Sequence, residues 1–266
     1  MNKNENLPVL GFIGTGTINS ALVKGFCRSS APAYPIVVSP QYPEKAAELK
    51  ALFPQRVTVA GSIQEVADNS DWLFVAVLPP AATEVYGTTK FRPQHKVINL
   101  IPQCSFPQIK AWIGETAILA HIIPLVFVAE VRGPIVLCPP LEEVAELLRP
   151  IGDIVTVESR PEAALLQDIT GLEAAFFTLL DGIAAWAAEQ GLNQEAARSY
   201  TASFFKALAE LGQAVTAERL HELADEFTPG GLNELAKAYL SATGALGRWR
   251  EALEKVAAHN PAPLTG

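Results

Sequence analysis

The feature that most constrains the fold is an apolar segment near the N-terminus that runs into two glycines. Residues 10–25 read Leu-Gly-Phe-Ile-Gly-Thr-Gly-Thr-Ile-Asn-Ser-Ala-Leu-Val-Lys-Gly. The segment predicts a buried strand that ends at Ile13 and is followed by a tight turn. Apolar residues then recur at Ile18, Leu22 and Phe26, which is the spacing of one helix face. A strand, a glycine turn and a helix in this order are typical of the start of a dinucleotide-binding domain.

The turn has the residues that a pyrophosphate group needs. Gly14 permits the sharp turn, Gly16 lets the backbone approach the phosphates, and the free N–H groups at the start of the helix face the anion. Asn19 stands where this pattern usually has Gly or Ala, which predicts slightly wider spacing between helix and strand. A glycine-rich turn without a ligand is the alternative. The predicted cofactor contacts here are Gly14, Thr15, Gly16, Thr17 and Ile18.

Composition favours a small-molecule partner. The chain has 266 residues, of which 49% are hydrophobic, enough for a packed core, and its net charge is −8. Because Lys and Arg are not clustered, a nucleic-acid surface and an anionic membrane are disfavoured. Cys27, Cys104 and Cys138 are too widely spaced to suggest a disulfide framework or a metal site.

The first residues predict an intracellular location. Met1–Leu7 is polar, so no signal peptide is expected there. We also expect no apolar run as long as the ~20 residues of a membrane span. We therefore expect a cytoplasmic protein without a membrane segment.

Residues 1–159 alternate between strand-like and helix-like segments. Such alternation predicts the α/β class, with an N-terminal Rossmann domain whose doubly wound, mostly parallel sheet is covered by helices on both faces. Predicted strands lie near 8–13, 35–38, 57–59, 72–77, 96–99, 116–120, 134–138 and 153–157, and predicted helices near 17–28, 43–52, 62–67, 80–88 and 141–148.

Residues 160–266 lack strand signals and are rich in Ala, Leu and Glu. Helical spacing predicts an all-α domain with helices over 162–190, 193–212 and 216–226 and two more after Gly231. The segment from Ala174 to Ala188 is apolar on nearly all sides, so it must be buried. We expect a partner subunit to cover it, which makes this a dimerisation domain and the protein a homodimer.

The end of the second strand bears on the choice of nicotinamide cofactor. An acidic residue normally binds the ribose 2′-hydroxyl there and selects NAD, but this chain has Val-Ser-Pro-Gln over 38–41. Without that carboxylate a 2′-phosphate is not repelled, and Ser39, Gln41 and Lys45 are candidates to bind it. NADP is therefore favoured, with NAD still possible. An ordinary turn at the strand end is the alternative reading.

The fourth strand ends Phe-Val-Ala-Val-Leu-Pro-Pro over 74–80. Its carboxyl end lies at the edge of the sheet where doubly wound folds bind ligands. Ala76, Val77, Leu78 and Pro79 are therefore predicted to line the nicotinamide ribose.

Several motifs together resemble pyrroline-5-carboxylate reductases. Residues 11–25 resemble the family opening GFIGAGNMAxALxxG, Ala-Val-Leu-Pro over 76–79 resembles AVKPQ, and Thr-Pro-Gly-Gly over 228–231 resembles SPGGTT. Phe-Thr-Leu-Leu-Asp over 177–181 resembles the long helix of that family. The resemblance covers most of the chain.

This resemblance implies a two-domain subunit that reduces a cyclic imine with NAD(P)H to give proline. Some members place a threonine at the position of Thr178, near the imine nitrogen. The family holds the substrate carboxylate with an SGSGP loop and the SPGGTT turn. By this resemblance the substrate-binding residues here are Thr228, Gly230, Gly231 and Asn233.

The substrate side departs from the family more than the cofactor side. Residues 169–175 replace the SGSGP loop and introduce Glu173, and Ile-Pro-Leu-Val-Phe over 123–127 replaces MPNTP. Leu78 replaces the lysine of AVKPQ, and Leu232 and Asn233 replace the two threonines of SPGGTT. Because Glu173 would repel a carboxylate and stabilise a cationic iminium, these changes suggest an imine without the usual carboxylate.

Other functions remain open at this point. A β-hydroxyacid dehydrogenase relies on a lysine in the first long helix of its second domain, but no lysine lies between Lys110 and Lys206. Imine reduction needs only orientation and a weak proton donor, so Thr178 and Glu173 are the catalytic candidates. A nucleotide-binding regulatory protein without catalysis is a further alternative. His121 is interpreted as a core histidine rather than a proton donor.

Overall fold

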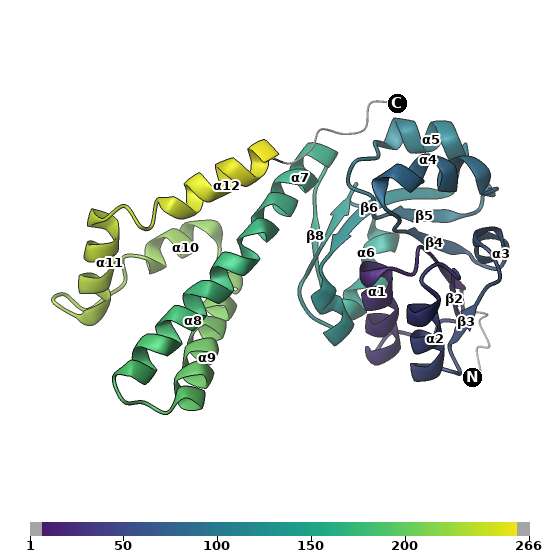
Figure 1. Ribbon diagram of the computed structural model, residues 1–266. Helices are drawn as coiled ribbons and strands as arrows, with labels where there is room; N and C mark the ends of the chain where they lie inside the picture. Colours follow the sequence, from purple (N-terminus) through teal and green to yellow (C-terminus); the bar gives the residue numbers. More distant parts are fainter. Residues whose placement is uncertain (1–6, 260–266) are drawn as a thin grey trace, which may run out of the picture. The chain divides into compact units, whose positions relative to one another are not determined.

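The computed structural model describes residues 7–259, so the ends of the predicted 1–159 and 160–266 domains lie outside the described part. Contacts within the chain separate a first unit that ends at Gln167 from a second unit that begins at Asp168. The division falls inside helix α7, Arg160–Ile169, a few residues after the predicted boundary. Each unit is described separately below (Figure 1).

The first unit is built on one eight-stranded sheet in the order β3-β2-β1-β4-β5-β6-β7-β8. All neighbouring strands are parallel except β6 and β7, which are antiparallel. The strand order reverses between β1 and β4, the point at which doubly wound sheets bind their ligands. The strands are β1 Leu10–Ile13, β2 Ile36–Val38, β3 Val57–Val59, β4 Trp72–Val75, β5 Lys96–Asn99, β6 Ile118–Pro124, β7 Pro134–Cys138 and β8 Asp153–Thr156.

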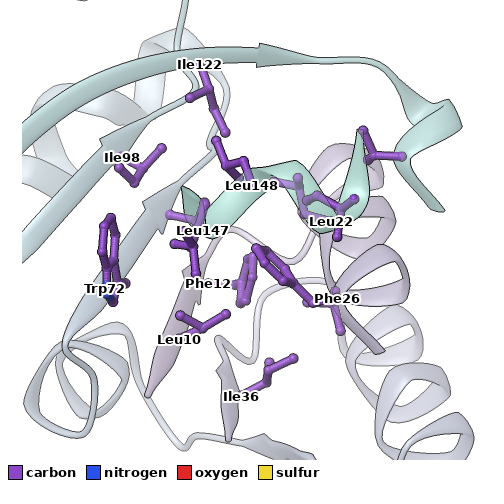
Figure 2. Packing of buried hydrophobic residues seen from close by; sticks show 14 of the residues in the cluster. Leu10, Phe12, Leu22, Phe26, Ile36, Trp72, Ile98, Ile122, Leu147 and Leu148 are labelled. Atoms are coloured by element: carbon purple, nitrogen blue, oxygen red, sulfur yellow. The ribbon is translucent and has the colours of Figure 1, made fainter. Parts of the chain in front are cut away.

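Helices cover both faces of this sheet. On one face, Phe12 of β1 stacks on Phe74 of β4 at 4.8 Å, and Phe26 of helix α1 packs against both. Figure 2 shows Phe12 and Phe26 among the other buried residues of this face. On the other face, buried Tyr86 stacks on Trp112 at 5.7 Å. The predicted α/β fold is thus confirmed. The helices of this unit are α1 Thr17–Arg28, α2 Pro43–Leu52, α3 Ile63–Asp68, α4 Pro79–Thr88, α5 Phe106–Ile113 and α6 Glu142–Leu148, with 3-10 turns Val126–Glu130 and Arg149–Ile151.

Helix α5 is an element that the sequence analysis did not predict. Its signals are local: Ser105 caps the helix by accepting a hydrogen bond from the N–H of Gln108, and Pro107 stands in the first turn. Eight residues are too few for an apolar period to be distinguished from a loop.

The second unit is helical. Its longest helices, α8 and α9, lie side by side (Figure 1), and Phe176 meets Phe205 edge to face at 6.3 Å. Asn193 caps α9 by accepting hydrogen bonds from the N–H groups of Glu195 and Ala196. The all-α prediction is confirmed. Its elements are the turn Thr170–Leu172 and helices α8 Glu173–Glu189, α9 Gln194–Gln213, α10 Ala217–Leu223, α11 Leu232–Ala242 and α12 Arg248–His259.

Helix α8 exposes most of its apolar surface. Within α8, Ala184 is the buried residue, while Phe177 and Trp186 are 54% and 63% exposed. The continuous helix Arg160–Glu189 is long and apolar enough to cross a membrane, judged by length and composition alone. One such helix is weak evidence for a membrane span, because the core helix of a globular protein passes the same test, so the expectation of no membrane segment is not overturned.

Candidate functional site

A pocket of about 740 Å³ lies where β1 and β4 end, at the reversal of strand order. Three segments supply most of its wall: the glycine turn, the segment that follows β2, and the segment that follows β4. This is the position that the strand order predicts for a ligand. Residues from these segments that line it are Gly14, Gly16, Thr17, Ile18, Gln41, Tyr42, Lys45, Ala76, Val77 and Leu78.

The glycine turn has the geometry of an anion cradle. Gly14 has φ +83°, and a Cβ atom there would lie 2.3 Å from the carbonyl oxygen of Ala76, so only glycine fits. At Gly16 a Cβ atom would meet only the ring of Tyr42, at 3.9 Å, so the backbone is open to the pocket. Gly16 caps α1 without a side-chain hydrogen bond. The first N–H groups of α1 are therefore free to bind an anion.

Ser39 and Thr15 have different roles from those predicted. Both side chains are fully buried. The hydroxyl of Ser39 accepts a hydrogen bond from the N–H of Gly14 at 2.9 Å, and the hydroxyl of Thr15 donates to the carbonyl oxygen of Ser39 at 2.6 Å. These bonds hold the glycine turn against the end of β2. Ser39 therefore shapes the turn from inside and does not present its hydroxyl to a 2′-phosphate.

The residues after Ser39 supply the polar wall of the pocket. Lys45 donates from Nζ to the hydroxyl of Thr17 at 3.0 Å and lies 5.8 Å from the ring of Tyr42. It forms no ion pair with any residue in the range 7–259. Tyr42 has φ +59° and forms the N-cap of α2. A cation beside the glycine turn, with no acidic residue at the end of β2, favours a phosphate at this wall.

The segment that follows β4 forms the opposite wall. The N–H of Ala76 donates to the carbonyl oxygen of Ile13 at 2.9 Å, which fixes this segment beside the turn. Leu78 is 68% exposed and caps α4, and Pro79 begins that helix. Of the four residues predicted here, Ala76, Val77 and Leu78 line the pocket.

The Asn19 side chain connects helix α1 to the sheet through hydrogen bonds. Its side-chain nitrogen donates to the carbonyl oxygens of Ile13, Gly14 and Phe74 at 3.0, 3.0 and 3.3 Å. These bonds tie α1 to the ends of β1 and β4. The larger side chain thus replaces the close packing of a third glycine with hydrogen bonds.

The predicted catalytic residues both lie on α8, in the second unit. Glu173 is the first residue of the helix and is exposed. Thr178 is also exposed, and its hydroxyl donates to the carbonyl oxygen of Ala174 at 2.9 Å. Thr178 lines a shallow groove of about 340 Å³ together with Leu179, Gly182, Ile183 and Trp186. All residues that line the larger pocket belong to the first unit.

The turn over 228–231 leads into helix α11. The N-cap of α11 is Gly231, so Thr228 does not cap the helix and Pro229 is not its first residue. The N–H of Gly230 donates to the carboxylate of Glu234 at 2.6 Å, and the N–H of Gly231 donates to the carbonyl oxygen of Thr228 at 2.8 Å. The N–H groups of Gly230 and Gly231, two residues that the family resemblance assigns to substrate binding, are therefore occupied within the turn. Asn233 is exposed in the first turn of α11.

His121 is buried, as its interpretation as a core histidine predicts, and it belongs to a polar network that the sequence analysis did not predict. Asn99 accepts hydrogen bonds from the hydroxyl of Tyr86 and the N–H of Ile101, and it donates to the carbonyl oxygen of Ile101. Its second amide hydrogen faces Nδ1 of His121 at 2.9 Å. This makes Nδ1 the acceptor and leaves a proton on Nε2, a buried atom without a described partner. Burial raises the pKa of Tyr86 well above its ordinary value.

Comparison with known proteins agrees with this geometry. The family profile described as "NADP oxidoreductase coenzyme F420-dependent" matches residues 9–101. The pyrroline-5-carboxylate reductase of Pseudomonas aeruginosa is 22% identical over 247 residues, covering 89% of this chain and 90% of that protein. The enzyme of the same name from Aquifex aeolicus is 24% identical over 257 residues, covering 92% and 94%.

Over about nine tenths of its length the chain is thus similar to two proteins named pyrroline-5-carboxylate reductase. The fold agrees as well: the NADP-bound structure of Plasmodium falciparum pyrroline carboxylate reductase has a TM-score of 0.77 at 17% identity, covering 95% of this chain and 96% of that one. The pyrroline-5-carboxylate reductase resemblance stated from the motifs is thus confirmed. Its strongest local basis, the glycine turn, is also the part of the site with the most constrained geometry.

Proposed function

We propose that this protein is an NADPH-dependent reductase of a cyclic imine, such as pyrroline-5-carboxylate or a related compound. The observation that carries the proposal is the open glycine turn in a pocket at the reversal of strand order. Two relatives named pyrroline-5-carboxylate reductase, each aligned over about nine tenths of the chain, support the imine as the substrate class.

The pocket residues fit a dinucleotide phosphate. The N–H groups at the start of α1 would bind the pyrophosphate over the open backbone of Gly16. Lys45 and Gln41 would hold a 2′-phosphate, which makes NADP the favoured cofactor and NAD the alternative. When bound, the reduced cofactor supplies a hydride.

The remaining roles in catalysis fall to residues that orient the imine. Reducing a C=N bond requires a hydride at carbon and a proton at nitrogen, so the protein needs a hydrogen-bonding group rather than a strong base. Thr178 would orient the nitrogen through its hydroxyl, and Glu173 would stabilise a cationic iminium. The absence of lysine between Lys110 and Lys206 disfavours alcohol oxidation of the β-hydroxyacid type.

We also propose a homodimer formed through α8 and α9. Phe177 and Trp186 on α8 and Tyr200 on α9 are too large and too exposed to remain in water in a monomer. A lipid bilayer fits this surface poorly, because Asp181 stands in the middle of α8 and a carboxylate at the bilayer centre costs about 2.5–3.5 kcal/mol. A second copy of the helix pair, in a cytoplasmic protein, is the occupant that we favour.

The decisive experiment combines binding and turnover. NADPH and NADH affinities are measured by fluorescence, and NADPH oxidation is then followed with cyclic imines and with 2-hydroxy and 2-oxo acids. We expect tighter binding of NADPH than of NADH and turnover with imines only. Tight NADPH binding without turnover on any of these compounds would instead identify a nucleotide-binding regulatory protein.

A further inference from the structure

Arg160 is a partly buried cation whose hydrogen-bonding capacity is largely unused. It lies at the start of α7 within the first unit. Its Nη2 atom donates to the carbonyl oxygen of Pro102 and, at 3.5 Å, to that of Cys104, and its guanidinium lies 6.0 Å from the ring of Phe106. Its Nη1 atom is buried and has no partner among the described residues.

Two other arginines show what a purely structural role requires. Arg56 uses Nε, Nη1 and Nη2 to bind three backbone carbonyl oxygens. Arg92 likewise uses all three nitrogens, binding His95 and three carbonyl oxygens. Arg160 clamps its loop with one nitrogen only. Holding the loop therefore explains only the Nη2 atom of Arg160 and leaves the buried Nη1 atom without a described hydrogen-bond partner.

No carboxylate neutralises this charge. Arg160 forms no ion pair with any residue between 7 and 259, and the groups that influence it electrostatically are Cys104 and Tyr86. Burial lowers the pKa of Arg160 to about 10, so it is still a cation at neutral pH. Buried charges are normally paired, because an unpaired charge loses its hydration without compensation. An anion is the partner that this site lacks.

The cation adjoins the proposed active site through the loop that it clamps. Leu100 lines the large pocket, and Pro102 is two residues further along, at most about 7 Å away along the chain. Leu100 directly follows the last residue of β5, Asn99, which pairs in register with Val75 at the end of β4. Arg160 as a whole is partly exposed, whereas its Nη1 atom is buried.

We propose that Arg160 binds a carboxylate group of the imine substrate. This inference rests on the proposed function and narrows it to imines that carry a carboxylate. It replaces the expectation drawn from Glu173, because Glu173 is an exposed side chain in the second unit whereas Arg160 is a half-buried cation without a partner. It also provides a carboxylate contact in place of the 228–231 turn, whose glycine N–H groups are occupied.

The test compares one imine with and without a carboxylate, pyrroline-5-carboxylate and 1-pyrroline, in three proteins. In the wild type we expect higher kcat/KM for the carboxylated imine. In Arg160→Gln that kcat/KM should fall about 10- to 100-fold, the effect of losing a charged hydrogen bond, while 1-pyrroline and the KM for NADPH change little. Arg149→Gln removes an exposed arginine of the same unit, which is paired with Glu142. This variant should leave the ratio of kcat/KM for pyrroline-5-carboxylate to kcat/KM for 1-pyrroline unchanged.

Two further measurements separate the possible failures. Arg160→Lys keeps the positive charge but loses the two-pronged hydrogen-bonding geometry of the guanidinium. This variant should recover part of the preference in kcat/KM for pyrroline-5-carboxylate over 1-pyrroline, which a purely structural loss would not show. Binding of pyrrole-2-carboxylate and of pyrrole to the NADP⁺-loaded protein is measured by calorimetry. Carboxylate binding that depends on Arg160, without turnover of either imine, would overturn the proposed function and would leave Arg160 as a carboxylate site without an imine substrate. Equal loss with both imines in Arg160→Gln would overturn the inference alone.

Discussion

The two units of this protein bury their apolar residues very differently. In the first unit, strands and helices enclose aromatic clusters such as Phe12, Phe26 and Phe74, none of which is exposed. In the second unit, Ala184 and Ala197 are the buried apolar residues among those described, whereas Phe177 and Trp186 are more than half exposed. The first unit therefore encloses its own hydrophobic core, whereas the second unit leaves large apolar side chains exposed on its surface.

This difference separates two kinds of structural requirement. A sheet covered by helices on both faces buries its apolar side chains within one chain, so its stability depends on close packing at positions such as Gly14. Paired helices without a third layer leave one face open, so their stability depends on association. The four predictions below act on one unit at a time, and they run from the largest expected change in free energy to the smallest.

Gly14→Ala should be the most damaging single substitution in the first unit. Its backbone conformation costs a non-glycine residue about 1–2 kcal/mol, and the clash with the carbonyl oxygen of Ala76 adds about 1–3 kcal/mol. We expect the free energy of unfolding to fall by about 2–5 kcal/mol, measured with urea, and NADPH binding to be lost. Gly114→Ala is the control, because Gly114 also has positive φ but nothing within 4 Å. Equal effects at both positions would show that the contact with Ala76 does not matter.

Trp186→Glu should break the proposed dimer of the second unit. A buried tryptophan at an interface contributes about 2–4 kcal/mol, so the dimer should dissociate about 30- to 1000-fold more readily. Sedimentation velocity over a range of concentrations measures this directly. Leu52→Glu, at a position that is 50% exposed in the first unit, is the matched control and should leave the mass unchanged. A wild-type protein that is monomeric at every concentration would contradict the comparison of the two units.

Lys45→Gln should alter cofactor choice while leaving both units folded. Loss of a charged hydrogen bond to a phosphate costs about 1.5–3 kcal/mol, which corresponds to about 10- to 100-fold weaker NADPH binding. NADH lacks that phosphate, so its affinity should hardly change. Lys50→Gln lies on the same helix and removes a lysine whose hydrogen bond within residues 7–259 goes to the carbonyl oxygen of Pro54, at 3.0 Å. If Lys50→Gln weakens NADPH binding as strongly, the effect is one of general charge and not of the pocket wall.

The sequence predicted the first unit better than the site, for identifiable reasons. Strand and helix periods in 10–99 are strong because each element has a buried face, and β5 and α2 have the bounds predicted for them. Ser39 was predicted at the right place, but sequence does not reveal that its hydroxyl points into the glycine turn. The pairing of Gly230 with Glu234 and the unused nitrogen of Arg160 likewise depend on side-chain positions. A motif locates a backbone, whereas the direction of a polar group follows from tertiary packing.

Asn19→Ala offers the finest test of how the first unit holds its cofactor turn. The substitution removes hydrogen bonds to the carbonyl oxygens of Ile13, Gly14 and Phe74, while the Oδ1 atom of Asn19 is buried and already unpaired. Loss of the donors and relief of that unpaired oxygen oppose each other, so the free energy of unfolding should fall by only about 1–2 kcal/mol. Ser20→Ala is the control next to it, because the buried hydroxyl of Ser20 has no described partner and its removal should cost close to nothing. A stabilised Asn19→Ala protein would show that α1 packs more closely on the sheet without the amide, as the usual glycine or alanine at this position allows.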